Sequence, residues 1–460
     1  MQKLSPDDQL RWPVNVSKGP TLLTVLLTCL CYVKINDAFG LLPNKIVATV
    51  TDNGSNFVKA FREFGVRFHL TDYADDDNDD NDTGDSAADR QETEDVQFVE
   101  IHDNAPLSDD GGSSLIELPT HIRCASHTFS LIATTDASVA IKNSPPFSRL
   151  NHTVMGKCSA LWNHCSRPKS AETVAEMCET TFRTPCATRW NSLYDSIKSL
   201  LEKRSVLPNL MLALHLPSFK DVELEFLDEY RQTLAPIAVA LDRLQGEKNC
   251  YYGDLLPTLF AVKTQLTALQ FVNLRHCVPL VNAIVAGFER RFVDFLNLTP
   301  DVNMAILATM THPYFKLRWL PSSLHDQRPR LQKLLITTAT SISFPVQDVG
   351  EVSLPKADRD TDDDYFGFTA VCSDESANDP VNNTNKSELE VLQFLEDTRR
   401  DMTVLNNFPL VKAMFIRFNS VLPSSAPVER LFSFAGIITR PHRRCMADSM
   451  FEKLLLLKEN

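Results

Sequence analysis

The sequence has no pair of cysteines separated by two residues, although it contains 11 cysteines. A zinc finger of the usual kind needs such a pair followed by two closely spaced histidines, and that spacing does not occur. The cysteines are also too scattered for the dense disulfide framework of a small secreted domain. The pattern therefore gives no zinc finger within these 460 residues and favours a reducing compartment.

The sequence also lacks a hydrophobic run long enough to cross a membrane. The apolar stretch near its start, residues 21–33, is 13 residues long, whereas a membrane-spanning helix needs roughly 20. The alternative is a signal peptide, but no cleavage site of small residues follows the stretch. We expect a buried helix there and no membrane partner.

Negative charge is concentrated in a single segment. The formal net charge is −13, but residues 71–110 carry 16 acidic residues and one basic residue, Arg90. The rest of the chain has 45 Lys and Arg against 43 Asp and Glu. Bulk charge therefore argues neither for nor against nucleic acid, and the acidic segment has too little apolar surface to fold.

Two stretches predict a strand followed by a helix. KIVATVT, residues 45–51, is short and β-branched, which indicates a buried strand, and FVKAFREF behind it spaces its apolar residues as a helix does. Residues 118–137 repeat the order of strand and helix. We therefore expect an α/β layer, joined to a large all-α insertion at residues 146–345, where leucines recur at helical spacing.

Asp52 follows the first predicted strand and precedes Asn-Gly-Ser. An aspartate in this position usually caps the next helix by accepting a hydrogen bond from a backbone N–H two or three residues on. The alternative is a carboxylate that binds a metal ion, which would need further carboxylates to converge on it. Glu429 lies beside an apolar helix stripe, where a solvated boundary charge is the simplest interpretation.

Two other pairs are weak signals by themselves. Cys124 and His127 form an isolated C-x2-H pair, and two ligands do not make a zinc site. Arg189 and Trp190 offer an indole that can stack on a flipped base. A tryptophan beside a helix start is more often part of a core, so both interpretations stay open.

The last 75 residues predict a compact helical unit with three apolar stripes. Pro409 can open its first helix, whose stripe contains Leu410, Val411, Met414, Phe415 and Phe418. The three stripes hold more apolar surface than short helices can bury among themselves, so the remainder faces the α/β layer or a second chain. The residues expected at a dimer interface are Val428, Leu431, Phe432, Phe451, Leu454 and Leu455.

Five stretches together resemble the hAT family of DNA transposases and their domesticated BED-type relatives. They are TDNGSNF, RCASHTFSL, TRWNSLYDSI, HPYFKLRWL and LPSSAPVERLFSFAGIITRPHRRCMADSMFEKLLLLKEN, in this order. The resemblance implies a ribonuclease-H-like core, interrupted by a helical domain and completed by C-terminal helices that dimerise. It also implies three acidic residues that bind Mg²⁺, of which Asp52 matches the second and Glu429 the third. Cys124 and His127 match the family's C-x2-H, and Trp190 matches its base-stacking tryptophan.

The sequence departs from the family where the first aspartate and the BED zinc finger would stand. Asp7 and Asp8 lie in a polar tail without a strand pattern, and His312 stands where relatives usually have an aspartate. We therefore expect an incomplete, N-terminally truncated ribonuclease-H-like core. The predicted segments are a polar tail (1–20), a first core segment (21–70), an acidic disordered insertion (71–114), a second core segment (115–145), a helical insertion domain (146–345), an acidic linker (346–385) and the dimerisation region (386–460).

The leading hypothesis is a transposase-derived nuclear protein that forms a homodimer, has no catalysis and requires no cofactor. Losing one of three metal carboxylates typically costs on the order of a hundredfold or more in rate, which argues against an enzyme. DNA or chromatin is a further candidate partner, bound weakly and in a salt-sensitive way without the zinc finger. The alternatives are an active hAT transposase that uses Mg²⁺ to cleave and join DNA, or a fragment of a longer BED zinc-finger relative.

Overall fold

The computed structural model describes residues 32–37, 39–42, 45–64, 118–186, 191–246, 249–342, 380–439 and 446–459. The polar tail, most of the apolar stretch 21–33, the acidic insertion and most of the acidic linker lie outside these ranges, as do Arg189 and Trp190. The chain divides into two compact units. Unit 1 comprises Met1–Cys250, Val262–Val293 and Val421–Asn460, and unit 2 comprises Tyr251–Ala261 and Asp294–Ser420.

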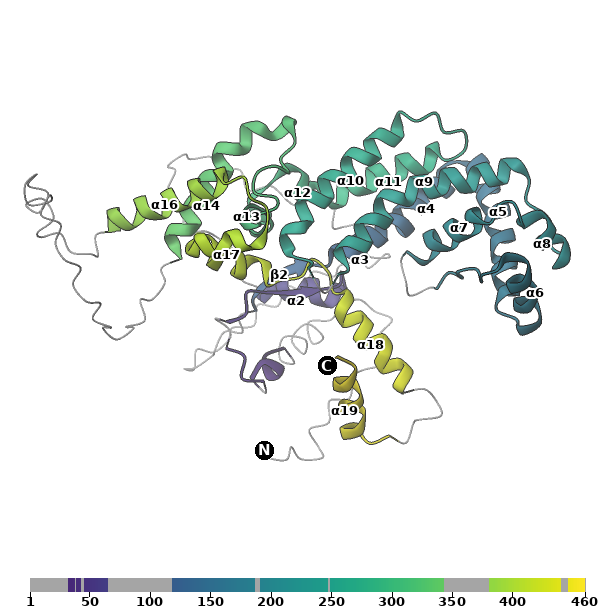
Figure 1. The fold of residues 1–460 in the computed structure, drawn as a ribbon, viewed down its shortest axis with the longest axis horizontal. Helices are drawn as coiled ribbons and strands as arrows, with labels where there is room; N and C mark the ends of the chain where they lie inside the picture. The colour runs from purple at the N-terminus through teal and green to yellow at the C-terminus, as the bar shows by residue number, and fades with distance from the viewer. Residues whose placement is uncertain are drawn as a thin grey trace, which may run out of the picture. The chain divides into compact units, whose positions relative to one another are not determined.

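Most described residues are helical (Figure 1). The elements of unit 1 are β1 (Ala48–Thr51), α2 (Ser55–Phe64), β2 (Thr120–Arg123), α3 (Ala125–Leu131), η4 (Ile132–Asp136), α4 (Ala137–Asn143), α5 (Pro145–Cys165), α6 (Pro168–Cys178), α7 (Ser192–Glu202), α8 (Leu207–Ala213), α9 (Asp221–Leu244), α11 (Val278–Arg291), α18 (Ala426–Ile438) and α19 (Asp448–Glu459). Those of unit 2 are η5 (Tyr252–Asp254), η6 (Pro300–Val302), α13 (Asn303–Thr311), η7 (Ser322–Gln327), α14 (Arg328–Ser341), α16 (Pro380–Glu396), η9 (Met402–Asn407) and α17 (Pro409–Asn419), while α10 (Leu255–Gln270) and α12 (Val293–Asn297) have residues in both ranges.

A parallel pair of strands forms the sheet of unit 1. Ala48 of β1 lies opposite Thr120 of β2, and the register continues to Thr51 opposite Arg123. Each strand leads into a helix, α2 or α3, so the predicted order of strand and helix is confirmed. The prediction of a buried β1 is wrong for most of the strand, since only Thr51 is buried. Among the described residues β2 is the only strand paired with β1, so only one edge of β1 is covered by a neighbouring strand. A two-stranded sheet does not test the ribonuclease-H-like core, which stays a prediction.

A small core lies between α2 and the strand β2. Ala60 and Phe61 of α2 are buried together with Leu118. The Phe61 ring stacks on the imidazole of His121, with ring centroids 4.6 Å apart. The predicted apolar face of this helix is therefore confirmed at Ala60 and Phe61, whereas Phe57 is exposed.

The imidazole of His121 makes this core sensitive to pH. Burial, and next the positive charge of Arg123, lower the pKa of His121 to about 4, while its unfolded value is about 6.5. Because the unfolded chain binds the proton more tightly, the neutral imidazole stabilises the fold fully above about pH 6.5 and progressively less as the pH falls towards 4.

We expect this effect to reach about 2 kcal/mol between pH 7 and pH 5. Hydrogen exchange of the β2 amides should report it as faster opening at the lower pH. A His121→Gln variant should lose that pH dependence, and an unchanged dependence in the variant would contradict the assignment.

The predicted helical character of residues 146–345 is confirmed where the chain is described. α9 illustrates the cause, because Leu224, Leu227, Leu234 and Leu241 are buried at spacings of three and seven residues along one stripe. Across the described residues, none of the helices combines the length and the apolar composition that a membrane crossing requires.

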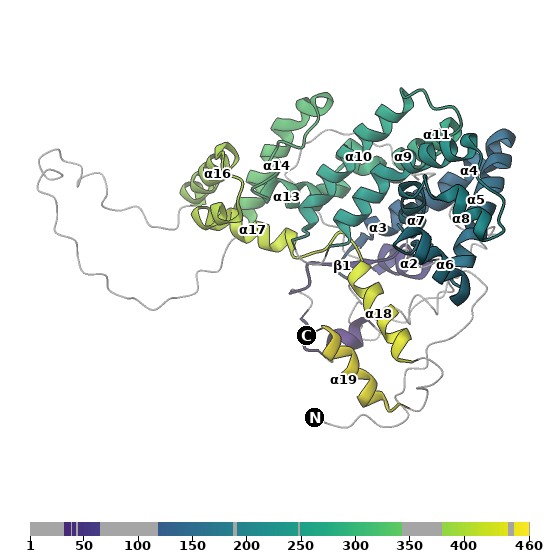
Figure 2. The same cartoon turned by 45° about the vertical axis from the view of Figure 1, so that its right-hand side comes forward.

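Unit 2 is a group of packed helices in which α13, α14, α16 and α17 lie beside one another in both views (Figures 1 and 2). Pro409 opens α17 as predicted. Of its predicted stripe, Val411, Met414, Phe415 and Phe418 are buried. α16 begins at Pro380, within the segment predicted as a linker.

Candidate functional site

Asp52 stands directly behind β1, and its side chain caps the start of α2. The Oδ1 atom accepts a hydrogen bond from the Gly54 N–H at 3.1 Å. A Cβ at position 54 would lie 2.9 Å from the same oxygen, so the glycine permits this close approach. The cap expected from the sequence is present, and the carboxylate is exposed. Its role as a metal ligand stays a prediction.

Cys124 is fully buried at the end of β2, where it joins the sheet to α3. Its backbone N–H donates to the carbonyl of Thr51 at 2.8 Å, and its Sγ accepts from the N–H of His127 at 3.3 Å. Cys124 is thus the N-cap residue of α3, bonded to the third residue of the helix. The C-x2-H spacing has a structural explanation here, because it is the spacing of a helix cap.

Residues 423–425 contact Cys124 and the neighbouring Ala125. The N–H of Ser425 donates to Cys124 Sγ at 3.2 Å, and the thiol donates to Ser424 Oγ at 3.7 Å. The N–H of Ala125 donates to the carbonyl of Pro423 at 2.9 Å. These contacts join segments about 300 residues apart in sequence and fix the point where α18 begins.

Glu429 lies in the first turn of α18, and its Oε1 accepts from the hydroxyl of Ser425 at 2.9 Å. Asp52 and Glu429 are therefore both linked to Cys124, the first through the neighbouring Thr51 and the second through Ser425. The fold thus brings the two predicted carboxylates to one region. Within the described ranges, no three His, Cys, Asp or Glu side chains form a group that could hold a metal ion.

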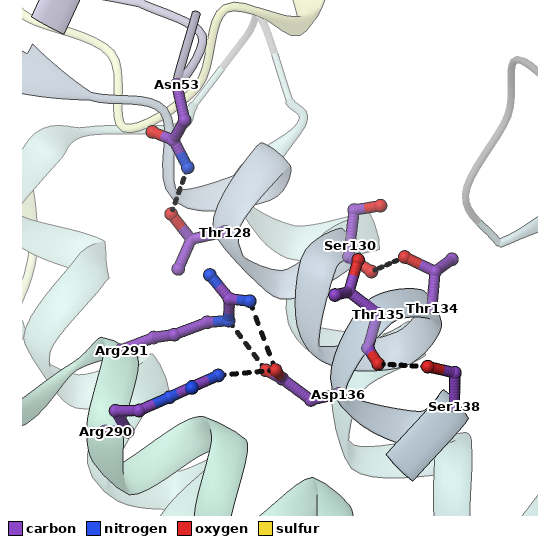
Figure 3. Close-up of polar contacts among 9 residues, drawn as sticks. All are labelled: Asn53, Thr128, Ser130, Thr134, Thr135, Asp136, Ser138, Arg290 and Arg291. Carbon is purple, nitrogen blue, oxygen red and sulfur yellow. Dashed lines mark hydrogen bonds and ion pairs between the residues drawn. The ribbon is translucent and has the colours of Figure 1, made fainter. Parts of the chain in front are cut away.

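A buried charge cluster anchors the helix that carries the Cys124 cap (Figure 3). Asp136 ends the π-helical turn η4 and is only 4% exposed. Its carboxylate accepts from Arg290 Nη2 and from Arg291 Nε, each at 2.6 Å. A Cβ at Gly287 would lie 2.4 Å from Asp136 Oδ2, so α11 can approach only because residue 287 is glycine. Burial raises the pKa of Asp136, and Arg290 opposes that effect.

A second contact in Figure 3 ties α3 to the loop behind β1. Asn53 Nδ2 donates to the hydroxyl of Thr128 at 3.3 Å, and that hydroxyl donates to the carbonyl of Cys124 at 3.1 Å. The residues on both sides of the sheet's end are therefore held by one continuous set of hydrogen bonds.

Helix α18, in the C-terminal region, exposes several of its apolar side chains. Val428 is 50% exposed and Phe432 68% exposed, whereas Leu431 is half-buried. α18 contacts α19, in which the predicted interface residues Phe451, Leu454 and Leu455 are half-buried. α18 and α19 therefore present apolar surface that their own contact does not cover.

Sequence reasoning missed two features of this arrangement. Ser424 and Ser425 precede Ala-Pro. This order is a signal for a helix start, but it does not predict the contact of the two serines with Cys124. Adjacent arginines at 290 and 291 are a signal for a carboxylate partner, yet nothing local identifies Asp136, which lies 154 residues from Arg290 in the sequence. Arg189 and Trp190 lie outside the described residues, so their predicted role in stacking on a base stays a prediction.

Comparison with protein families gives one finding. Residues 370–460 match the model described as the hAT family C-terminal dimerisation region. The match covers all six predicted interface residues as well as Glu429. No curated protein matches the chain.

Proposed function

The chain is a hAT-family, transposase-related protein with that family's C-terminal dimerisation region, and from this premise we propose that it acts by forming a homodimer in the nucleus, without catalysis. The dimerisation region supports self-association. A domesticated origin belongs to the same proposal. β1, β2 and their following helices are proposed as part of a ribonuclease-H-like core, which their parallel pairing supports.

The observation that carries self-association is the exposed apolar face of α18. Val428 and Phe432 stand four residues apart and therefore lie on the same side of the helix. Exposing them costs free energy, at roughly 25 cal/mol for each Å² of apolar surface left in water. A second copy of the chain would bury them, and aromatic residues such as Phe432 are typical anchors at the centre of an interface.

Phe432→Asp is expected to weaken self-association by about tenfold to a hundredfold, because it would bury an unpaired carboxylate in the interface. Light scattering on the intact chain across a concentration series measures this. Phe271→Asp is the control, since Phe271 is 84% exposed on unit 1 outside the dimerisation region. A monomeric wild type at micromolar concentration would overturn the proposal, as would equal effects of the two substitutions.

The proposal of no catalysis is supported by the set of carboxylates that the sequence supplies. Asp52 and Glu429 match two of the three metal ligands that the resemblance implies, and each already accepts a hydrogen bond. We expect no DNA nicking with Mg²⁺ or Mn²⁺. Metal-dependent nicking that disappears in Asp52→Asn would contradict this, and asparagine can retain the helix cap, so the variant should fold.

DNA or chromatin association is proposed as a weak, secondary activity. The near-neutral charge outside residues 71–110 neither repels a polyanion strongly nor attracts one, so bulk charge permits this association without driving it. Binding should therefore depend on local groups of basic residues.

A further inference from the structure

In unit 2 a buried lysine holds two turns side by side: residues 313–318, of which Tyr314 and Arg318 are exposed, and residues 397–401, most of which are exposed. Lys316 is buried, with a backbone φ of 49°. Its ammonium donates to the carbonyl of Asp397 and lies 4.6 Å from the centroid of the Phe394 ring. Lys316 thereby fixes residues 313–318 beside residues 397–401. Its ammonium group already has both of these contacts inside the unit.

The carboxylates of the second turn are already engaged. Asp397 accepts from Arg399 Nη2 at 2.6 Å and from its Nε at 3.1 Å, and these bonds lower the pKa of Asp397 to about 2. Asp401 accepts from the N–H of Thr403 at 3.1 Å. Neither carboxylate is therefore paired with the remaining basic side chains of the two turns.

Two arginines remain on this surface. Arg318 and Arg400 are both exposed, and in the described ranges of the chain neither forms an ion pair with a carboxylate. Arg318 Nη2 donates to the carbonyl of Pro313 at 3.4 Å. Partial burial, and next the nearby positive charge of Arg400, lower the pKa of Arg318. Two neighbouring guanidinium groups without carboxylate partners are suited to bind an anion.

An aromatic ring completes the surface. Arg318 Cζ lies 5.5 Å from the centroid of the Tyr314 ring, and Tyr314 is 52% exposed. The ring of Phe315 meets it edge-on, with centroids 5.1 Å apart at an angle of 90°. Tyr314 is therefore held in place by two neighbours while much of it faces solvent.

We propose that Arg318 and Arg400 bind backbone phosphates of a single-stranded nucleic acid and that Tyr314 stacks on one of its bases. Guanidinium forks match phosphate oxygens in geometry and charge. Stacking on an aromatic ring is typical of single-strand binding, since an unpaired base can leave its neighbours and every base has a flat face. An acidic peptide or a lipid headgroup would use the arginines but not the ring. The site lies in unit 2 and does not depend on self-association.

The test is fluorescence anisotropy of the full chain with a short, labelled DNA strand of mixed sequence, titrated at several salt concentrations. The double variant Arg318→Gln with Arg400→Gln should bind at least about tenfold more weakly. It should also reduce the slope of log affinity against log salt by about 1.4, or about 0.7 for each lost phosphate contact. The control, Arg328→Gln with Lys333→Gln, removes the same charge from exposed positions on α14 and should leave binding within about twofold of the wild type.

Three further variants separate stacking from charge. Tyr314→Ala should weaken single-strand binding by about fivefold or more, while Tyr314→Phe should not. Arg318→Lys with Arg400→Lys keeps the charge and should preserve the salt slope while lowering affinity.

Equal binding by the Gln variant and its control would overturn the proposal. So would tighter binding to duplex DNA, or an arginine-dependent interaction with phosphatidylserine vesicles and none with the strand. Circular dichroism checks the fold, and light scattering of the Gln variant should give the wild-type mass, so failure here is distinguishable from failure of self-association.

Discussion

Replacing Asp136 by alanine is expected to lower the stability of unit 1 by about 3–5 kcal/mol. The carboxylate is the shared partner of Arg290 and Arg291, and the Arg291 side chain is itself 7% exposed. Removing the carboxylate deprives a buried guanidinium of this counter-charge, and weakening the pairing of a buried charge is among the more costly changes in a fold. The loss should concern η4, α4 and α11, which meet at this cluster.

Hydrogen exchange of the α4 and α11 amides in the full chain measures that loss locally. Ser138→Ala is the control, because Ser138 lies two residues on, and its exposed hydroxyl donates only to the nearby carbonyl of Thr135. We expect the control to change protection by less than about 0.5 kcal/mol. Equal protection in the two variants would show that the charge cluster does not stabilise these helices.

The same substitution tests how the cluster supports the candidate site. α3 carries the Cys124 cap at one end and continues through η4 to Asp136 at the other. The cap in turn receives the Ser425 N–H, which fixes the start of α18. Loosening η4 should therefore also increase exchange at the first residues of α18, although these are far from Asp136 in sequence.

The sequence was sufficient where the information is local. The β-branched run ending at Thr51, the Asp52 cap on Gly54 and the buried stripe of α17 each depend on neighbours within a few residues. Hydrophobic spacing and capping chemistry act over that range, so pattern alone predicts them.

The sequence was insufficient where contacting residues are far apart in the chain, and where the question is whether an apolar face is buried or exposed. A C-x2-H pair is equally consistent with a metal ligand set and with a helix cap, and only the contact of Cys124 with Ser425 shows which atoms the thiol meets. The stripe on α18 has the same spacing as the one on α17, yet Phe432 is exposed and Phe418 is buried. Spacing identifies an apolar face, but it does not identify what covers that face.

At the centre of unit 2, Gly253→Ala is expected to lower the stability by about 3 kcal/mol or more. A Cβ at this position would lie 2.6 Å from the carbonyl oxygen of Ala308 and 2.9 Å from its carbon. That carbonyl cannot easily move, because it belongs to α13 and also accepts from Asn419 Nδ2 at 3.0 Å. Asn419 Oδ1 in turn accepts from the Gly253 N–H at 2.9 Å, so shifting the backbone at either end breaks a buried hydrogen bond.

The same substitution at Gly156 should have the opposite effect on stability. Gly156 lies inside α5, and a Cβ there would meet nothing within 4 Å, so alanine should stabilise the helix by about 0.5–1 kcal/mol. Hydrogen exchange in α13 and α17 for the first variant, and in α5 for the second, separates the two effects within the 460-residue chain. If Gly253→Ala left protection in α13 and α17 unchanged, the close approach of η5 to α13 would not be a constraint on unit 2, and the buried Asn419 would have to be satisfied in another way.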